Sequence, residues 1–156
     1  MGKRSSRTAA EAAKPAVFVG SSAESATIAN AIHLSLVHGF RVTPWTAGAF
    51  RPGERPLASI ERQAGRSDYG IFIFTPDDVV VSRKRRKDAV RDNVLFELGL
   101  FIGKLGADNC FVMVPEGWAD MKMPSDLMGY QPVQYESGRL ATESPQIAVS
   151  AALPEA

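Results

Sequence analysis

Cysteine and histidine are scarce in this chain of 156 residues, which contains one cysteine, Cys110, and two histidines, His33 and His38. A single cysteine excludes a disulfide framework within the chain and a cysteine-rich zinc site. The two histidines have no cysteine or acidic residue at ligand spacing, and amphipathic helix positions explain them. We therefore expect no metal site.

Long apolar runs and an excess of charge of one sign are absent too. No run approaches the ~18 residues needed to cross a bilayer, and no apolar stretch of a secretory signal follows the basic N-terminus. The 18 Lys and Arg residues against 17 Asp and Glu residues leave a net charge of +1, which argues against general binding to nucleic acid or to a membrane surface. We expect a cytoplasmic protein.

Three familiar motifs are missing. There is no G-x-G-x-x-G after the first apolar run, no G-x-x-x-x-G-K-[ST] and no G-x-S-x-G, which excludes the common phosphate-cradling loops and the hydrolase elbow. The composition, with 45% apolar and 22% charged residues, and the length of the chain are typical of one soluble globular domain.

Short apolar runs alternate with segments of helical periodicity along the chain. This alternation predicts a flavodoxin-like, doubly wound α/β fold with a five-stranded parallel sheet. We expect one domain over residues 15–136, a disordered tail at 1–14 and a second tail at 137–156. The predicted strands are 16–20, 40–44, 69–74, 109–114 and 132–135, and the predicted helices are 24–38, 57–64 and 93–105.

In such a fold, ligands bind beyond the carboxyl ends of the strands. The predicted helix 93–105 begins near this rim and is apolar nearly all round, and Glu97 is its only ionisable residue before Lys104. A charged, unpaired carboxylate there costs several kcal/mol. Either Glu97 pairs with Arg91, a backbone donor or solvent, or it is held in a pocket for an electron-poor or hydroxyl-rich ligand.

The run Asp92-Asn93-Val94-Leu95-Phe96-Glu97-Leu98-Gly99 resembles a motif of the bacterial TIR-like predicted nucleotide-binding proteins, the effector domains of cyclic-nucleotide antiphage systems such as the TIR–STING fusions. Segments 17–22, 45–50, 72–78 and 124–129 resemble the same family in the same order, so the likeness covers about residues 15–136. The resemblance implies a TIR-like fold and cleavage of NAD⁺ as substrate, with Glu97 as the catalytic residue and no cofactor.

Breaking the nicotinamide–ribose bond passes through an oxocarbenium-like state that one carboxylate can stabilise. Trp45 and Phe50 are candidates for stacking on nicotinamide or adenine, and packing of their loop explains them equally well. After the first strand, Gly20, Ser21 and Ser22 are candidates for phosphate binding at a helix N-terminus, with helix capping as the alternative. Asp77, Asp78 and Asn93 are candidates for holding ribose or water, with turn formation and capping as their alternatives.

TIR enzymes typically become active on assembly, so the resemblance implies a homo-oligomer or filament. The outward side of the predicted helix, Phe96 and Leu100, suits either a partner or the core. We expect no sensor module after Tyr135, which leaves a separate cyclic-nucleotide sensor or a free-standing effector. The basic run 83–87 suggests a solvated loop, and its alternatives are NAD⁺ phosphates, a subunit contact and, last, nucleic acid.

Two other functions remain open from the sequence. The first is a non-enzymatic scaffold that only binds a nucleotide or a partner TIR domain. The second is a nucleoside deoxyribosyltransferase-like enzyme, which shares the flavodoxin-like plan and uses a glutamate nucleophile. We favour the NAD⁺ glycohydrolase because a scaffold has no need of Glu97.

Overall fold

The structure is a computed structural model that describes residues 14–45, 53, 55–82, 85–127, 129–150 and 152. Side chains are not described for residues 79–86 and 120. The predicted tail 1–14, apart from Lys14, and Phe50 of the predicted site lie outside the described residues.

Five parallel strands form the central sheet in the order β2-β1-β3-β6-β7. In this order β2 lies on one side of β1, and β3, β6 and β7 follow on the other side. The direction of the strand order therefore reverses at β1, as in flavodoxin-like folds. The predicted fold class is confirmed, including the edge position of the fifth strand. The strands are β1 (Ala16–Gly20), β2 (Arg41–Pro44), β3 (Tyr69–Ile73), β6 (Cys110–Pro115) and β7 (Val133–Tyr135).

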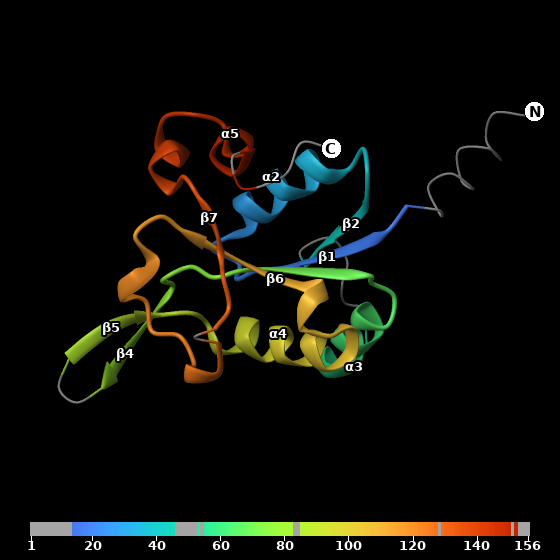
Figure 1. Ribbon diagram of the computed structural model, residues 1–156, viewed down its shortest axis with the longest axis horizontal. Helices are drawn as coiled ribbons and strands as arrows, with labels where there is room; N and C mark the ends of the chain where they lie inside the picture. The colour runs from blue at the N-terminus through green and yellow to red at the C-terminus, as the bar shows by residue number, and fades with distance from the viewer. Residues whose placement is uncertain are drawn as a thin grey trace, which may run out of the picture.

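Helices cover both faces of this sheet (Figure 1). Val17 and Ile71 belong to the cluster on the side of α2, whereas Phe18 and Phe72 belong to the cluster on the side of α4. Both faces are apolar because successive side chains of a strand point to opposite sides. One face carries α2 (Ala26–Leu36) and α5 (Pro145–Ser150), and the other carries α3 (Pro56–Ala64) and α4 (Asp92–Leu105).

Three buried phenylalanine rings fix α4 against the sheet. Phe101 of α4 stacks on Phe18 of β1 at 4.8 Å between ring centroids and meets Phe72 of β3 edge-on at 5.2 Å. Each such pair contributes about 0.5–1.5 kcal/mol beyond the apolar area that it buries. Because Glu97 lies one turn before Phe101, this packing also sets the position of its carboxyl group.

The segment between β3 and α4 is a hairpin that the sequence pattern does not predict. Its strands are β4 (Asp78–Ser82) and β5 (Arg85–Ala89), which pair antiparallel and project from the domain (Figure 1). Consecutive valines favour a strand, but the run of cations beside them masks the apolar alternation from which a strand is usually inferred.

The prediction of a tail over residues 137–156 is wrong for its described part. A 3-10 helix, η4 (Ser137–Ala141), is followed by α5, whose Ala148 and Val149 are buried beside α2. The backbone N–H of Glu136 donates to the carbonyl of Ala148 at 3.0 Å. A helix of six residues is too short to show a helical period in the sequence. No described helix could cross a membrane.

Candidate functional site

The carboxyl ends of β1, β2 and β3 meet at one edge of the sheet, where α4 begins. Gly20 ends β1, Trp45 follows β2, and Thr75 and Asp77 follow β3. The backbone N–H of Trp45 donates to the carbonyl of Val19 at 2.8 Å and so continues the pairing of β1 with β2. The sheet thus places most predicted site residues on the rim where this fold binds ligands.

Glu97 lies in the second turn of α4 and is only 2% exposed. Its Oε2 atom lies 3.2 Å from the point that a Cβ atom would occupy on Gly20. Within the described residues, Oε2 has no hydrogen-bond partner. The carboxyl group is therefore buried against the end of β1, at the centre of the rim.

Burial raises the pKa of Glu97 from 4.5 to about 7, and a hydrogen bond with the side chain of Trp45 limits this rise. Removal from water disfavours the charged form of a carboxyl group. Such a group is partly ionised near neutral pH and is sensitive to any cation that approaches it.

The alternative in which Glu97 pairs with Arg91 is wrong. Arg91 instead forms an ion pair with Glu24, and its Nε lies 3.7 Å from Oδ1 of Asp78. These groups lie on the outer side of the rim and are more than a third exposed, so the pairs contribute little stability. Asp78, predicted as a site residue, is thus engaged by Arg91.

Asp77 is the centre of a hydroxyl network that joins two loops. Its Oδ2 atom accepts hydrogen bonds from Ser22 Oγ at 2.5 Å and from Thr75 Oγ1. Ser25 Oγ lies 2.9 Å from Ser22 Oγ and 2.6 Å from Thr75 Oγ1. Two donors occupy this oxygen, so Asp77 supports the Gly20–Ser22 loop that lies over Glu97.

Ser21 and Ser22 do not cap the helix that follows them, so this alternative is wrong. Helix α2 begins at Ala26, with Ser25 at the N-cap position and no side-chain cap. Ser21 is 1% exposed, and its hydroxyl has no hydrogen-bond partner among the described residues. An unpartnered buried donor at the end of β1 is the kind of group that a ligand satisfies. Asn93, in the first turn of α4, is exposed.

Sequence reasoning missed two residues of this edge, namely Ser25 and Tyr135. Tyr135 ends β7 and is 2% exposed, and burial together with the charge of Asp77 raises its pKa to about 12. It is therefore a neutral phenol at neutral pH. No local pattern indicates these contacts, because each one joins segments far apart in the sequence.

Two other features bear on ligand binding, the grouping of metal-ligand side chains and an apolar cavity. Within the described ranges, no three His, Cys, Asp or Glu side chains are grouped as metal ligands. A cavity of about 400 Å³ is lined by Val17, Tyr69 and Phe111 near the opposite ends of the strands. Since Gly20 and Glu97 are not among its lining residues, this cavity is separate from the rim.

The resemblance is confirmed by comparison with known proteins. Residues 16–137 match the family described as CAP12/Pycsar effector protein, TIR domain. The Pycsar effector protein PaPycTIR of Pseudomonas aeruginosa is 43% identical over 120 residues, which are 76% of this chain and 39% of that protein. The CD-NTase-associated protein 12 of Flavobacterium daejeonense is 38% identical over 123 residues, 79% of this chain and 39% of that protein.

The chain thus spans about two-fifths of the length of these relatives. The match includes β1, the Glu97 helix and every described strand of the central sheet, so the likeness includes the rim as well as the fold. The family match and the two relatives agree, and the chain belongs to the TIR-domain family of the CAP12/Pycsar effector proteins.

Proposed function

We propose that the protein is an NAD⁺ nucleosidase that cleaves the nicotinamide–ribose bond and acts as an antiphage effector. The observation that carries the proposal is the buried carboxyl group of Glu97, which has no ion-pair partner among the described residues and lies on the ligand-binding rim of a TIR effector domain. A charged carboxyl group without a partner in this buried setting lowers the stability of the fold, and a cationic ligand offsets that loss.

In the proposed reaction, the C1′–N bond breaks and its electron pair moves to the pyridinium nitrogen. Nicotinamide leaves as a neutral molecule, so no strong general acid is needed. The Glu97 carboxylate stabilises the positive ribose carbon and its hydroxyl groups. Water then attacks, which gives ADP-ribose and a proton, whereas attack by the adenine of the same molecule gives a cyclic product.

The pH dependence of cleavage follows from the Glu97 pKa of about 7. The carboxylate is the active form, so kcat/KM should rise with pH and level off above a midpoint near 7, because kcat/KM reports the free enzyme. The midpoint of kcat should be lower, since the positive charge of bound NAD⁺ favours the carboxylate. Initial rates of nicotinamide release between pH 5 and 9 measure both midpoints.

Trp45→Phe supplies the control for this assignment. The hydrogen bond with Trp45 lowers the Glu97 pKa, so its loss should move the kcat/KM midpoint above the wild-type value. A midpoint that stays fixed in Trp45→Phe, or a rate that falls with rising pH, contradicts the assignment of the active carboxylate to Glu97.

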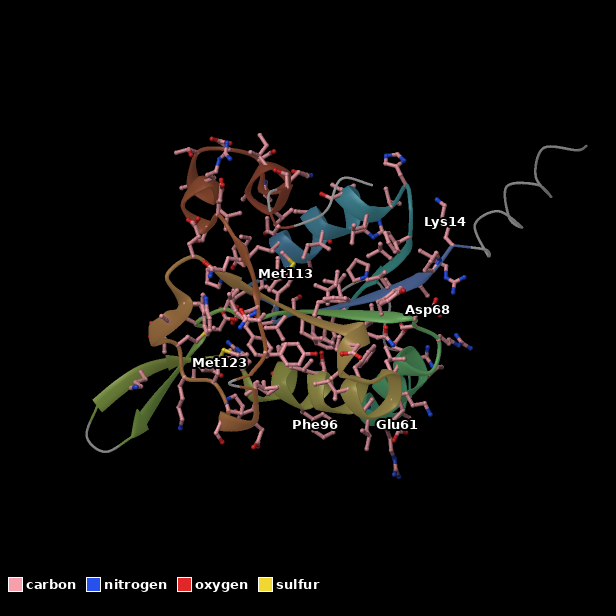
Figure 2. The ribbon with its side chains drawn as sticks, viewed as in Figure 1. Lys14, Glu61, Asp68, Phe96, Met113 and Met123 are labelled. Carbon is pink, nitrogen blue, oxygen red and sulfur yellow. The ribbon has the colours of Figure 1, made fainter. Side chains whose placement is uncertain are left out.

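Self-association is the proposed means of activation. Phe96 of α4 is 56% exposed and points away from the sheet (Figure 2). Exposed aromatic side chains of this kind are enriched at protein interfaces. The rate per protomer should rise with protein concentration, and Phe96→Ser should shift this rise to about tenfold higher concentration.

Leu34→Ser is the matched control for Phe96→Ser, since Leu34 is 53% exposed on α2. The proposed interface predicts no shift for this variant. An equal shift in both variants, or none in Phe96→Ser, would contradict the assignment of the interface to α4.

The same assay with deoxynucleosides in place of NAD⁺ tests the transferase alternative, which requires base exchange.

A further inference from the structure

A second cavity lies beside the β4–β5 hairpin, and its lining residues differ from those of the rim. It has a volume of about 370 Å³, and the residues that line it include Lys87, Trp118, Met121, Lys122, Met123 and Tyr130. We call it the hairpin cavity. Figure 2 labels Met123 near the base of the hairpin. None of its lining residues is among those assigned to the Glu97 site.

The backbone brings two lysines of this cavity together. Lys122 forms a parallel bridge with Ala89 of β5, and its N–H donates to the carbonyl of Asp88 at 2.7 Å. Lys87 lies two positions before Ala89 on the same strand, so Lys87 and Lys122 share one face of the pair. Both lysines are exposed, and neither has an ion-pair partner in the described part of the chain.

Aromatic and thioether side chains form most of the remaining wall. Trp118, Met123 and Tyr130 are partly buried and pack against the core cluster that contains α4. The Tyr130 hydroxyl lies within hydrogen-bond distance of two backbone carbonyls, that of Cys110 at 2.6 Å and that of Ala107 at 2.7 Å, which fixes its ring at the cavity. Met121, which also lines the cavity, is buried.

This combination indicates the chemistry of a ligand. Two ammonium groups with no carboxylate partner repel each other, and a phosphate group between them relieves that repulsion. Indole and phenol rings bind planar heteroaromatic rings by stacking, worth about 1–3 kcal/mol per base. The volume falls within the range of about 300–1,000 Å³ that is typical of small-molecule sites.

We propose that the hairpin cavity binds a planar aromatic anion of mononucleotide size, with its anionic group on Lys87 and Lys122 and its ring against Trp118 or Tyr130. The site assigns a role to Lys87, one of the five cations of the basic run 83–87. The proposal goes beyond NAD⁺ cleavage and holds whether or not Glu97 is catalytic.

Calorimetric titration of the full chain with 5′-AMP tests the proposal. Binding should weaken by about tenfold or more in the double variant Lys87→Gln/Lys122→Gln, because two charge-assisted contacts are lost. Lys104→Gln, which removes an exposed lysine that does not line the cavity, should bind as the wild type does. Adenosine and inorganic phosphate, each lacking half of the ligand, should bind more weakly than AMP.

Lysine acetylation followed by mass spectrometry gives a second readout on the unmodified sequence. Saturating AMP should protect Lys87 and Lys122 and leave Lys104 as reactive as before. Equal AMP affinity in the double variant and the wild type, no measurable AMP binding, or loss of AMP binding in Glu97→Gln alone would each overturn the proposal. The last result would place the nucleotide at the rim instead.

Discussion

Glu97→Gln should abolish NAD⁺ cleavage and at the same time make the protein more stable at alkaline pH. The rate of nicotinamide release should fall by about a thousandfold, or ~4 kcal/mol of transition-state stabilisation, because an amide cannot balance the charge of the ribosyl cation. Glutamine has the same shape, so the loss cannot come from a cavity in the core.

The stability gain follows from the pKa of Glu97, about 7 in the folded state against its ordinary value of 4.5. Between these values the folded state holds a proton that the unfolded state has released, so the free energy of unfolding falls as pH rises from 4.5 through 7. The full loss is about 3 kcal/mol. At pH 8 the variant should therefore be roughly 1–3 kcal/mol more stable than the wild type, since its buried amide retains some cost.

Urea unfolding at pH 4 and pH 8 measures this difference. The two proteins should have similar stability at pH 4 and should differ at pH 8. A variant that is equally destabilised at both pH values would show that Glu97 is a structural group. A variant that retains NAD⁺ cleavage would remove its catalytic role.

Gly20→Ala should impair both folding and cleavage, whereas Gly70→Ala should impair folding alone. A Cβ atom on Gly20 would lie 2.6 Å from the Phe72 ring and 3.2 Å from Glu97 Oε2. On Gly70 it would lie 2.7 Å from the same ring and 3.1 Å from Phe101, with no contact to Glu97 among its nearest atoms. Such overpacking costs about 1–3 kcal/mol in each variant.

The paired design separates a general loss of stability from an effect on the carboxyl group. Assayed well below both melting temperatures, Gly70→Ala should keep its rate within about twofold, while Gly20→Ala should lose about tenfold, as expected for a displaced catalytic group. Equal rates in the two variants would contradict the position of Glu97 against the end of β1.

The predictable parts of the fold are those that local periodicity encodes. The apolar runs of β1 and β3 and the stripe of α4 specify buried elements, and the parallel order follows from their alternation. The hairpin and α5 are not predictable in this way. Valines beside a cation run do not alternate, and α5 is fixed by its packing on α2 rather than by its own six residues.

The candidate site also has one part that the local sequence predicts and another part that only the tertiary fold determines. Glu97 stands out in the sequence because a lone acid in an apolar helix requires an explanation, and the match to the TIR family adds to it. The bond between Ser22 and Asp77, 55 positions apart, and the proximity of Tyr135 are set by the strand order and leave no local trace. Sequence reasoning therefore predicts the acid and the loops, but not the network that supports them.

The most direct test of the proposed activity is release of nicotinamide from NAD⁺ by concentrated wild-type protein, followed by chromatography and compared across protein concentrations. Both hydrolysis and cyclisation release nicotinamide, so this readout does not depend on the fate of the ribose. We predict one nicotinamide per NAD⁺ consumed, at a rate per protomer that rises with concentration. Intact NAD⁺ after incubation with protein held in an enforced oligomer would contradict the account.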